Sequence, residues 1–288
     1  MLRKIFVCCA PLSLCLSLVP TSEAQTSKAQ TPKLTAEQVV EKNVAAVGGA
    51  QAWRGVHAMT WTGKMDAGPG DSMARSKRVS QSRVAPTAAS AMATPDTSEE
   101  KQVQLPFTYN LARPNKSRLE IVFNGKTAVQ IFDGTNGWKQ RPYLNRNDVE
   151  AFTAEELKGE SEQANLDGPL VDAAAKGNKI AMDGLEKVDG HEAYRLKVTL
   201  KDESVRHVWV DAQSFLELRR EGQPRRMDGK MHHVYTDLKD YRKEQGVMVP
   251  HLLENTVEGY RDVHQVVIES VVINPKLDDA MFKKPQAK

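Results

Sequence analysis

Two short segments contain the residue types of a serine hydrolase, so acyl-transfer chemistry is considered first. Gly70-Asp71-Ser72 supplies a hydroxyl group, and Asp262-Val263-His264 supplies an acid and a base. A serine esterase needs its base within hydrogen-bond reach of the hydroxyl. Esterases with a Gly-Asp-Ser segment separate acid and base by two residues and place the serine between a strand and a helix. Here one residue separates them, and the serine lies in a loop of a β-rich sequence. The sequence predicts no catalytic residue.

Histidine and acidic residues are the next candidates, as ligands of a metal ion. His232 and His233 are adjacent and would point to opposite faces of a strand, which is poor geometry for sharing one metal ion. The other five of the seven histidines are scattered without the spacing of ligands. The sequence predicts no metal and no cofactor.

Arginine residues leave two possibilities for binding a charged group. Arg113 stands at the start of a strand beside Pro114, where it would hold a lipid head group or a carbonyl group, or pair with a surface carboxylate. Arg219-Arg220 and Arg225-Arg226 flank an expected hairpin. They would contact an anionic membrane or a receptor, or form an ordinary solvated hairpin.

The first 24 residues have the three parts of a secretory signal peptide. Arg3-Lys4 precedes an apolar run from Ile5 to Val19, and Ser22 and Ala24 form a small-x-small site with cleavage after Ala24. The apolar run is shorter than the roughly 20 residues of a membrane span. We expect a cleaved leader over residues 1–24, a flexible linker over 25–34 and a periplasmic protein.

Removal of the leader would change the composition of the chain. Cys8, Cys9 and Cys15, the three cysteines, all lie in it, so the mature chain would have no disulfide. Leu12 to Cys15 faintly resembles a lipid-anchor box, but Leu14 is too bulky for that position. Two of 40 basic and one of 37 acidic residues would be lost, leaving a net charge of +2, which argues against nucleic acid as a partner.

The segment from Arg113 to Trp138 predicts an antiparallel meander. Leu119, Ile121 and Phe123 alternate with polar residues, which is the two-residue period of a half-buried strand. Asn124-Gly125 predicts a two-residue hairpin turn, because both residues tolerate a positive φ. Val129 and Ile131 continue a second strand, and a third follows Asp133-Gly134.

The remaining chain is mostly strand and turn. Thr35 to Gln38 and Thr153 to Glu156 are capping boxes that predict helices, and a further helix is expected from Gly168-Pro169 to Gly177. The expected strands cover residues 57–65, 75–84, 103–111, 113–141, 179–186, 192–201, 205–211, 215–221, 231–241, 249–257 and 263–273. Residues 85–101, rich in Ala, Ser, Thr and Pro, read as a mobile insertion in a hairpin.

This pattern predicts a mainly β protein with a few helices. About eleven strands in one meander must curl and protect their edges, either by closing or by remaining half open with helices packed inside. The central helices at residues 153–176 favour an unclosed antiparallel β-barrel, with helices capping its concave apolar face.

Eight short motifs in order resemble the outer-membrane lipoprotein-sorting proteins of the LolA/LolB-like superfamily. The motifs are Gly48-Gly49 with Ala52-Trp53, Arg113-Pro114-Asn115-Lys116, Asp133-Gly134 with Gly137-Trp138, Asp167-Gly168-Pro169-Leu170, Asp189-Gly190, Asp240-Tyr241, Val249-Pro250 and Phe282. The resemblance implies a single domain over residues 35–285, with an apolar cavity that takes acyl chains. The insertion at residues 85–101 is longer than the family pattern, so the resemblance does not define the geometry of the cavity mouth. The match is to the broad family, so it does not define the cargo.

A carrier of this kind needs an apolar wall and no catalyst, because each buried CH₂ of an acyl chain contributes about 0.8 kcal/mol. We expect a non-enzymatic carrier or chaperone for lipid or lipoprotein acyl chains, with an inner- or outer-membrane receptor as a further partner. The alternative is a periplasmic sensor of lipid or envelope stress that regulates a membrane partner. The residues expected at the cavity are Met59, Trp61, Met65, Phe107, Tyr109, Arg113, Leu119, Ile121, Phe123, Val129, Ile131 and Leu170. Ordinary core packing is the competing interpretation for each apolar residue.

Protease digestion tests the predicted insertion. Residues 85–101 have few large apolar side chains to anchor them, so we expect early cleavage there and a folded remainder. Limited proteolysis followed by mass spectrometry locates the cuts, and circular dichroism monitors the fold. Unfolding on cleavage would contradict the single-domain meander.

Overall fold

The computed structural model describes residues 34–67, 103–142 and 146–286. The predicted leader, most of the linker, the strand expected at residues 75–84 and the insertion at 85–101 lie outside these residues. The described residues belong to one compact unit that begins at Leu34.

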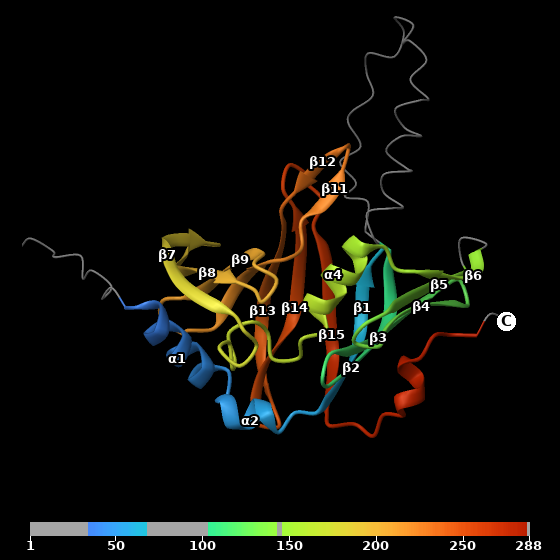
Figure 1. Cartoon of the computed structure of the whole chain (residues 1–288), viewed down its shortest axis with the longest axis horizontal. Coiled ribbons are helices and arrows are strands. Elements are labelled where there is room, and N and C mark those ends of the chain that lie inside the picture. Colours follow the sequence, from blue (N-terminus) through green and yellow to red (C-terminus); the bar gives the residue numbers. More distant parts are fainter. Residues whose placement is uncertain (1–33, 68–102, 143–145, 287–288) are drawn as a thin grey trace, which may run out of the picture. The chain divides into compact units, whose positions relative to one another are not determined.

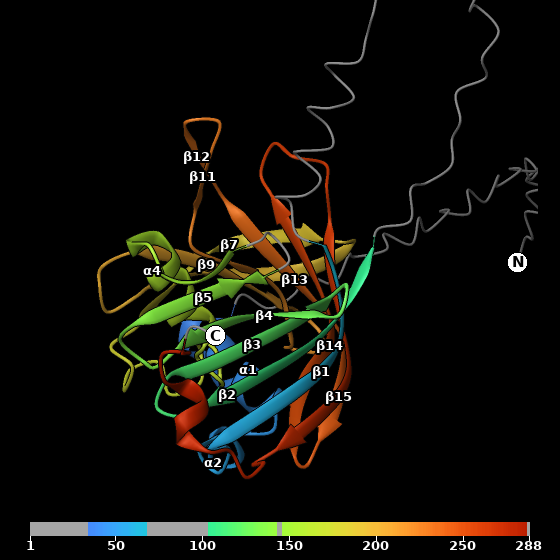
Figure 2. The same cartoon turned by 90° about the vertical axis from the view of Figure 1, so that its right-hand side faces the viewer.

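One antiparallel sheet of thirteen strands forms the framework of the described residues (Figures 1 and 2). Its strand order is β6-β5-β4-β3-β2-β1-β15-β14-β13-β10-β9-β8-β7. The strands are β1 (Ala58–Asp66), β2 (Gln104–Ala112), β3 (Lys116–Phe123), β4 (Lys126–Phe132), β5 (Gly137–Arg141), β6 (Arg146–Ala151), β7 (Lys179–Val188), β8 (His191–Thr199), β9 (Val205–Asp211), β10 (Glu217–Glu221), β13 (Val234–Glu244), β14 (Val247–Val257) and β15 (His264–Ile273). Because β6 and β7 remain edges, the sheet is not closed, and the predicted unclosed barrel is confirmed.

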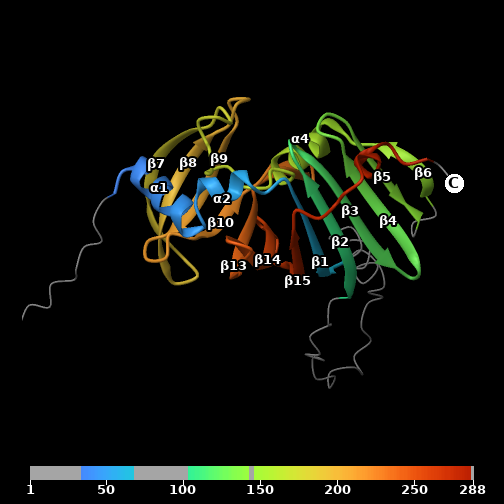
Figure 3. The same ribbon diagram turned by 90° about the horizontal axis from the view of Figure 1, so that it is seen from below.

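The sheet curves around its helices, as Figure 3 shows from below. The helical elements are α1 (Ala36–Ala46), α2 (Ala50–Arg54), α4 (Ala154–Gln163) and the short 3-10 helix η2 (Asp279–Phe282). A small hairpin of β11 (Arg225–Met227) and β12 (Lys230–His232) forms a second sheet. We call the face of the main sheet that carries Met59 the concave face and the opposite face the convex face.

Helix α1 covers one end of the concave face. Thr35 caps it, and the predicted capping box is present, with the Thr35 hydroxyl accepting from the Gln38 backbone amide at 3.3 Å. Val39 is fully buried and packs with Tyr194, Leu196 and other apolar residues of β8 and β9. The helix therefore covers the concave face of the sheet near its β7 edge by apolar packing.

The centre of the concave face is filled by α2 and by the chain after α4. Trp53 of α2 donates from Nε1 to the Val47 carbonyl at 3.0 Å and packs in a cluster with Met59 and Leu111. Val171 joins the same cluster from the segment that follows α4. The bottom of the curved sheet is thus an ordinary packed core.

The helix predicted from Gly168 to Gly177 is wrong, because the structure has consecutive turns there. Asp172 has φ 52°, and Gly168 and Gly177 also have positive φ, a conformation that interrupts an α-helix. The sequence pattern also missed β6 and β11, which are short and carry few apolar residues.

A pair of glycine substitutions separates steric from conformational constraints in the sheet. At Gly63, a Cβ atom would lie 2.0 Å from the carbonyl oxygen of Val267 at the β1–β15 bulge. Gly190 has φ +85°, but a Cβ there would meet nothing within 4 Å. We expect Gly63→Ala to lower the unfolding free energy by about 3 kcal/mol and Gly190→Ala by about 1 kcal/mol. Urea unfolding measures both, and equal losses would contradict the close approach of β15.

Candidate ligand-binding face

The strand register brings most of the predicted wall together on the concave face. Trp61 of β1 pairs with Tyr109 of β2, which pairs with Leu119 of β3. Directly paired residues of neighbouring strands share a face, and so do residues two apart along a strand. By this rule the face carries Met59, Trp61, Met65, Phe107, Tyr109, Leu119, Ile121 and Phe123.

These residues differ in how far they are buried. Met59 and Phe107 are buried, with 0% and 4% of their surface exposed. Trp61, Met65, Tyr109, Leu119, Ile121 and Phe123 are only half-buried. Leu253 and Val266 of β14 and β15, which continue the face beside Met65, are half-buried as well. The concave face therefore has a packed floor and a patch of accessible apolar side chains beyond it.

Val129 and Ile131 do not belong to this wall. The turn at Asn124-Gly125 pairs Phe123 with Lys126, so odd-numbered residues of β4 oppose even-numbered residues of β3. Val129 and Ile131 therefore lie on the convex face, where they pack with Phe282 of η2. The two-residue turn predicted from the sequence is confirmed. This turn places the odd-numbered residues of β4 on the face opposite to the odd-numbered residues of β3, so the expectation that Val129 and Ile131 line the concave wall is wrong.

Leu170 is also placed differently from the expectation that it lines the apolar cavity. It is 1% exposed and packs with Val39 of α1 and with Tyr194 and Leu196 of β8. The side chain is thus part of the fixed core at the α1 end of the sheet, because apolar residues from three elements surround it.

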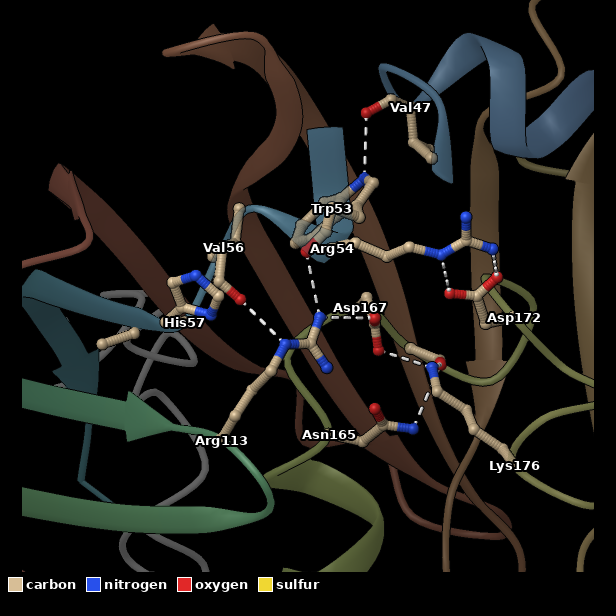
Figure 4. A network of polar contacts seen from close by, with 12 residues as sticks. Val47, Trp53, Arg54, Val56, His57, Arg113, Asn165, Asp167, Asp172 and Lys176 are labelled. Carbon is tan, nitrogen blue, oxygen red and sulfur yellow. Dashed lines mark hydrogen bonds and ion pairs between the residues drawn. The ribbon is translucent and has the colours of Figure 1, made fainter. Parts of the chain in front are cut away.

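Arg113 is held by buried acceptors (Figure 4). Its Nε donates to the Val56 carbonyl at 2.8 Å, and its Nη2 donates to the Trp53 carbonyl at 3.0 Å and to Asp167 Oδ2 at 2.7 Å. The Asp167 side chain is only 2% exposed. The carboxylate partner is therefore buried, whereas the sequence suggested a surface one, and Arg113 ties α2 to the segment after α4.

Asp167 also accepts a second cation. Lys176 Nζ donates to Asp167 Oδ1 at 2.5 Å and to the Gly168 carbonyl at 2.6 Å. Burial lowers the pKa of Lys176 below its ordinary value, and the pairing with Asp167 opposes this shift. Nearby, Arg54 forms a two-point ion pair with Asp172, at 2.8 and 2.6 Å, which lowers the pKa of that carboxyl group. Sequence reasoning missed Lys176 and Asp172, since neither stands in a pattern that predicts an ion pair.

Helix α4 has no buried residue; its Leu157 packs, half-buried, against the central apolar cluster, and its other contacts with the sheet are polar. Glu160 accepts from the Tyr109 hydroxyl at 3.0 Å and from the Ser117 hydroxyl. Glu162 accepts from Arg206 of β9 at 2.9 and 2.7 Å, while Lys139 of β5 contacts Glu156. The helix thus spans from β2–β5 to β9 and is anchored by charge at both sides.

One surface pocket of the described residues lies away from the predicted wall. A volume of about 360 Å³ opens on the convex side beside η2, lined by Lys116, Asp133, Thr135, Asn136, Asp279, Phe282 and Lys283. Within the described residues, no group of three or more histidine, cysteine or acidic side chains has an arrangement for a metal ion. Of the described helices, none is long and apolar enough to cross a membrane.

Comparison with known proteins places the fold. No family model and no curated protein matches the chain. Among solved structures, a LolA superfamily protein from Nitrosomonas europaea shares 14% sequence identity over 88% of this chain and 99% of its own, with a TM-score of 0.52. A DUF1329 family protein from Desulfovibrio piger shares 14% identity over 86% of this chain and 97% of its own, with a TM-score of 0.51. An outer-membrane lipoprotein-sorting protein domain from Vibrio parahaemolyticus shares 11% identity over 86% and 95%, with a TM-score of 0.49.

The class defined by these features is a half-open antiparallel barrel with helices on its concave face. This is the fold of the LolA superfamily protein from Nitrosomonas europaea, so the resemblance predicted from the sequence motifs is confirmed at the level of the fold.

The contact between α4 and the sheet predicts a pH dependence. Burial raises the pKa of Glu160 above its ordinary value of 4.5, although hydrogen bonds from Ser117 and Tyr109 oppose the shift. A raised folded-state pKa means that the stabilising contribution of this group is complete below the unfolded-state pKa and is lost as pH rises through the folded-state pKa. We expect Glu160→Gln, which keeps an acceptor oxygen, to be more stable than the parent at neutral pH.

The advantage of Glu160→Gln should shrink as pH falls through the raised folded-state pKa of Glu160, because the parent side chain becomes neutral there. Thermal unfolding from neutral to acidic pH measures the difference. Glu155→Gln, on the exposed side of the same helix, is the matched control and should follow the parent profile. A constant difference at all pH values would contradict the assignment to Glu160.

Proposed function

We propose that the protein is a non-enzymatic, periplasmic carrier that binds the acyl chains of lipids or lipoproteins on its concave face. The observation that carries this proposal is the patch of half-buried apolar side chains beyond the packed floor, formed by Trp61, Met65, Tyr109, Leu119 and Ile121. A contiguous accessible apolar surface on a soluble domain is a common mark of a binding site.

The physical chemistry of the patch suits an alkyl chain. Each CH₂ group removed from water contributes about 0.8 kcal/mol, so a dozen would supply on the order of 10 kcal/mol. The entropic cost of ordering the acyl chain reduces this gain. Met65 adds a flexible side chain that adapts to ligands of different shape. Trp61 and Tyr109, whose rings meet edge to face with centroids 5.9 Å apart, give the wall a fixed shape.

The open edges of the sheet support a reversible binder. The sheet is unclosed, and α4 covers the concave face with one half-buried apolar side chain, Leu157, and otherwise with polar contacts. A LolA superfamily protein has the same fold, and the resemblance of the sequence motifs to lipoprotein-sorting proteins supports a role in lipoprotein sorting. The leader expected at residues 1–24 supports the periplasmic location.

Extraction with organic solvent tests the cargo class directly. Lipids that co-purify with the protein are identified by mass spectrometry, and transfer of a labelled acyl ligand to acceptor vesicles then separates a carrier from a sensor. A carrier releases the label to the vesicles. Stable retention of the ligand, with one protein partner in pull-downs, would favour the sensor.

Adjacent residues of β3 provide a matched pair of variants. Ile121 lies on the concave face and is half-buried, whereas Val122 lies on the convex face and is 42% exposed. We expect Ile121→Glu to weaken binding of a fluorescent fatty acid about tenfold or more, because it places a charge in the apolar wall. Val122→Glu should leave the affinity within about twofold of the parent, since its side chain points away from the wall. Equal losses in two folded variants would contradict the concave site.

A further inference from the structure

Arg220 lies on the concave face, although its sequence neighbour Arg219 lies on the convex face. In the sheet Arg220 pairs with Val208 of β9 and Thr236 of β13. Val208 packs beneath α1, which fixes the face. Arg219 instead forms an ion pair with Asp237, at 2.9 Å from Nη2 to Oδ2. From the sequence, both arginines were expected to flank a solvated or membrane-facing hairpin. The strand register places Arg219 on the convex face and Arg220 on the concave face.

The guanidinium of Arg220 lies against the backbone of the segment after α4. A Cβ atom at Gly168 would be 2.6 Å from Arg220 Nη2, and the residue has φ +66°, which favours glycine. Arg220 Nε donates to Glu217, whose side chain is 5% exposed. The Arg220 side chain itself keeps 35% of its surface accessible. The side chain is therefore held in position while about a third of its surface stays accessible.

Three cations gather around two carboxylates in this region. Arg113 and Lys176 share Asp167, and Arg220 pairs with Glu217. Arg113 and Arg220 both disfavour the charged form of Lys176, which shows that the three charges act on one another. Arg54 and Asp172 form their own pair beside them and leave the balance unchanged.

This group of five side chains has one positive charge in excess. The carboxylates of Asp167 and Glu217 are buried and already engaged, so they do not neutralise a third cation. Charges in a protein interior are normally paired, and an unmatched one attracts a counter-charge more strongly than in water. Arginine binds carboxylate and phosphate through two parallel hydrogen bonds, which suits an arginine side chain that is held in position and partly accessible.

We propose that Arg220 binds the anionic oxygen end group, carboxylate or phosphate, of the acyl ligand, and that Lys176 and Arg113 supply the positive field around it. This inference rests on the proposed function, because the ligand's chain would lie on the same concave face. It narrows the ligand class from any acyl chain to amphiphiles with an anionic end group.

Competition binding with ligands of one chain length tests the assignment. Hexadecanoate, hexadecyl phosphate and hexadecanol displace a fluorescent, uncharged acyl probe from the full protein near pH 8, where the carboxylate is ionised. We expect the two anions to bind about tenfold more tightly than the alcohol. Inorganic phosphate should displace nothing, and displacement by it would assign the site to a free anion and overturn the end-group proposal.

Substitution of Arg220 gives the decisive comparison. Arg220→Gln should reduce the preference for the anions to about twofold or less and leave the affinity for hexadecanol unchanged. Arg225→Gln, the same change of charge at an exposed residue of the β11–β12 hairpin, should keep the full preference. Because Arg220→Gln leaves Glu217 buried without its partner, the double variant Glu217→Gln/Arg220→Gln repeats the test with both charges removed.

The outcomes separate this inference from the proposed function. If no ligand displaces the probe and the probe does not bind, the acyl-binding function itself fails. If the alcohol and the anions bind equally well to the parent protein, the apolar site stands and the anion site is overturned. A preference for anions that survives in the folded double variant would likewise overturn the role of Arg220.

Discussion

A single buried carboxylate, Asp167, organises the concave side of this protein. It accepts from Arg113 at 2.7 Å and from Lys176 at 2.5 Å, and Arg113 in turn binds the carbonyl groups of α2 and the start of the sheet. The turns from residue 166 to 177 have no helical or strand hydrogen-bond ladder, so these ion pairs and the burial of Leu170 and Val171 hold them in place. The chain that fills the floor of the sheet thereby depends in part on one charged centre, and removal of either cation would leave one oxygen of the buried carboxylate without its partner.

The concave face divides into regions with different kinds of packing. Its floor is apolar and closed, its end below α1 is apolar and closed, and the patch around Trp61 and Ile121 is apolar and accessible. The polar helix α4 lies over this side without burying a residue. Apolar packing stabilises the fold at two places, and the third stays accessible because α4 beside it contacts the sheet mainly through polar side chains.

Much of the fold followed from the sequence because strands and helix starts have local causes. Alternating apolar residues in β1 to β4 and the two capping boxes depend on neighbours a few residues away, and both were predicted correctly. The prediction of a helix from Gly168 to Gly177 is wrong. Gly168-Pro169 is typical of a helix start, whereas the positive φ of Asp172 has no signal in the sequence. The side of the sheet on which Val129, Ile131 and Arg220 lie required the register of pairing, which a single strand does not reveal. The ion pairs of Asp167 join residues up to 54 positions apart, and sequence patterns do not report such contacts.

The position of β1 in the sheet has a consequence for how the chain reaches this structure. The first strand lies between β2 and β15, and Met59 pairs with Ile273, more than 200 residues later. Until the last strand is available, one side of β1 presents unpaired backbone groups and half of the concave face has no opposite wall. Pairings of such long sequence separation are slow to form and leave edges open to other chains. During synthesis, which begins at the amino terminus, the free edge of β1 must therefore stay unpaired with strands of other chains until β15 has been made.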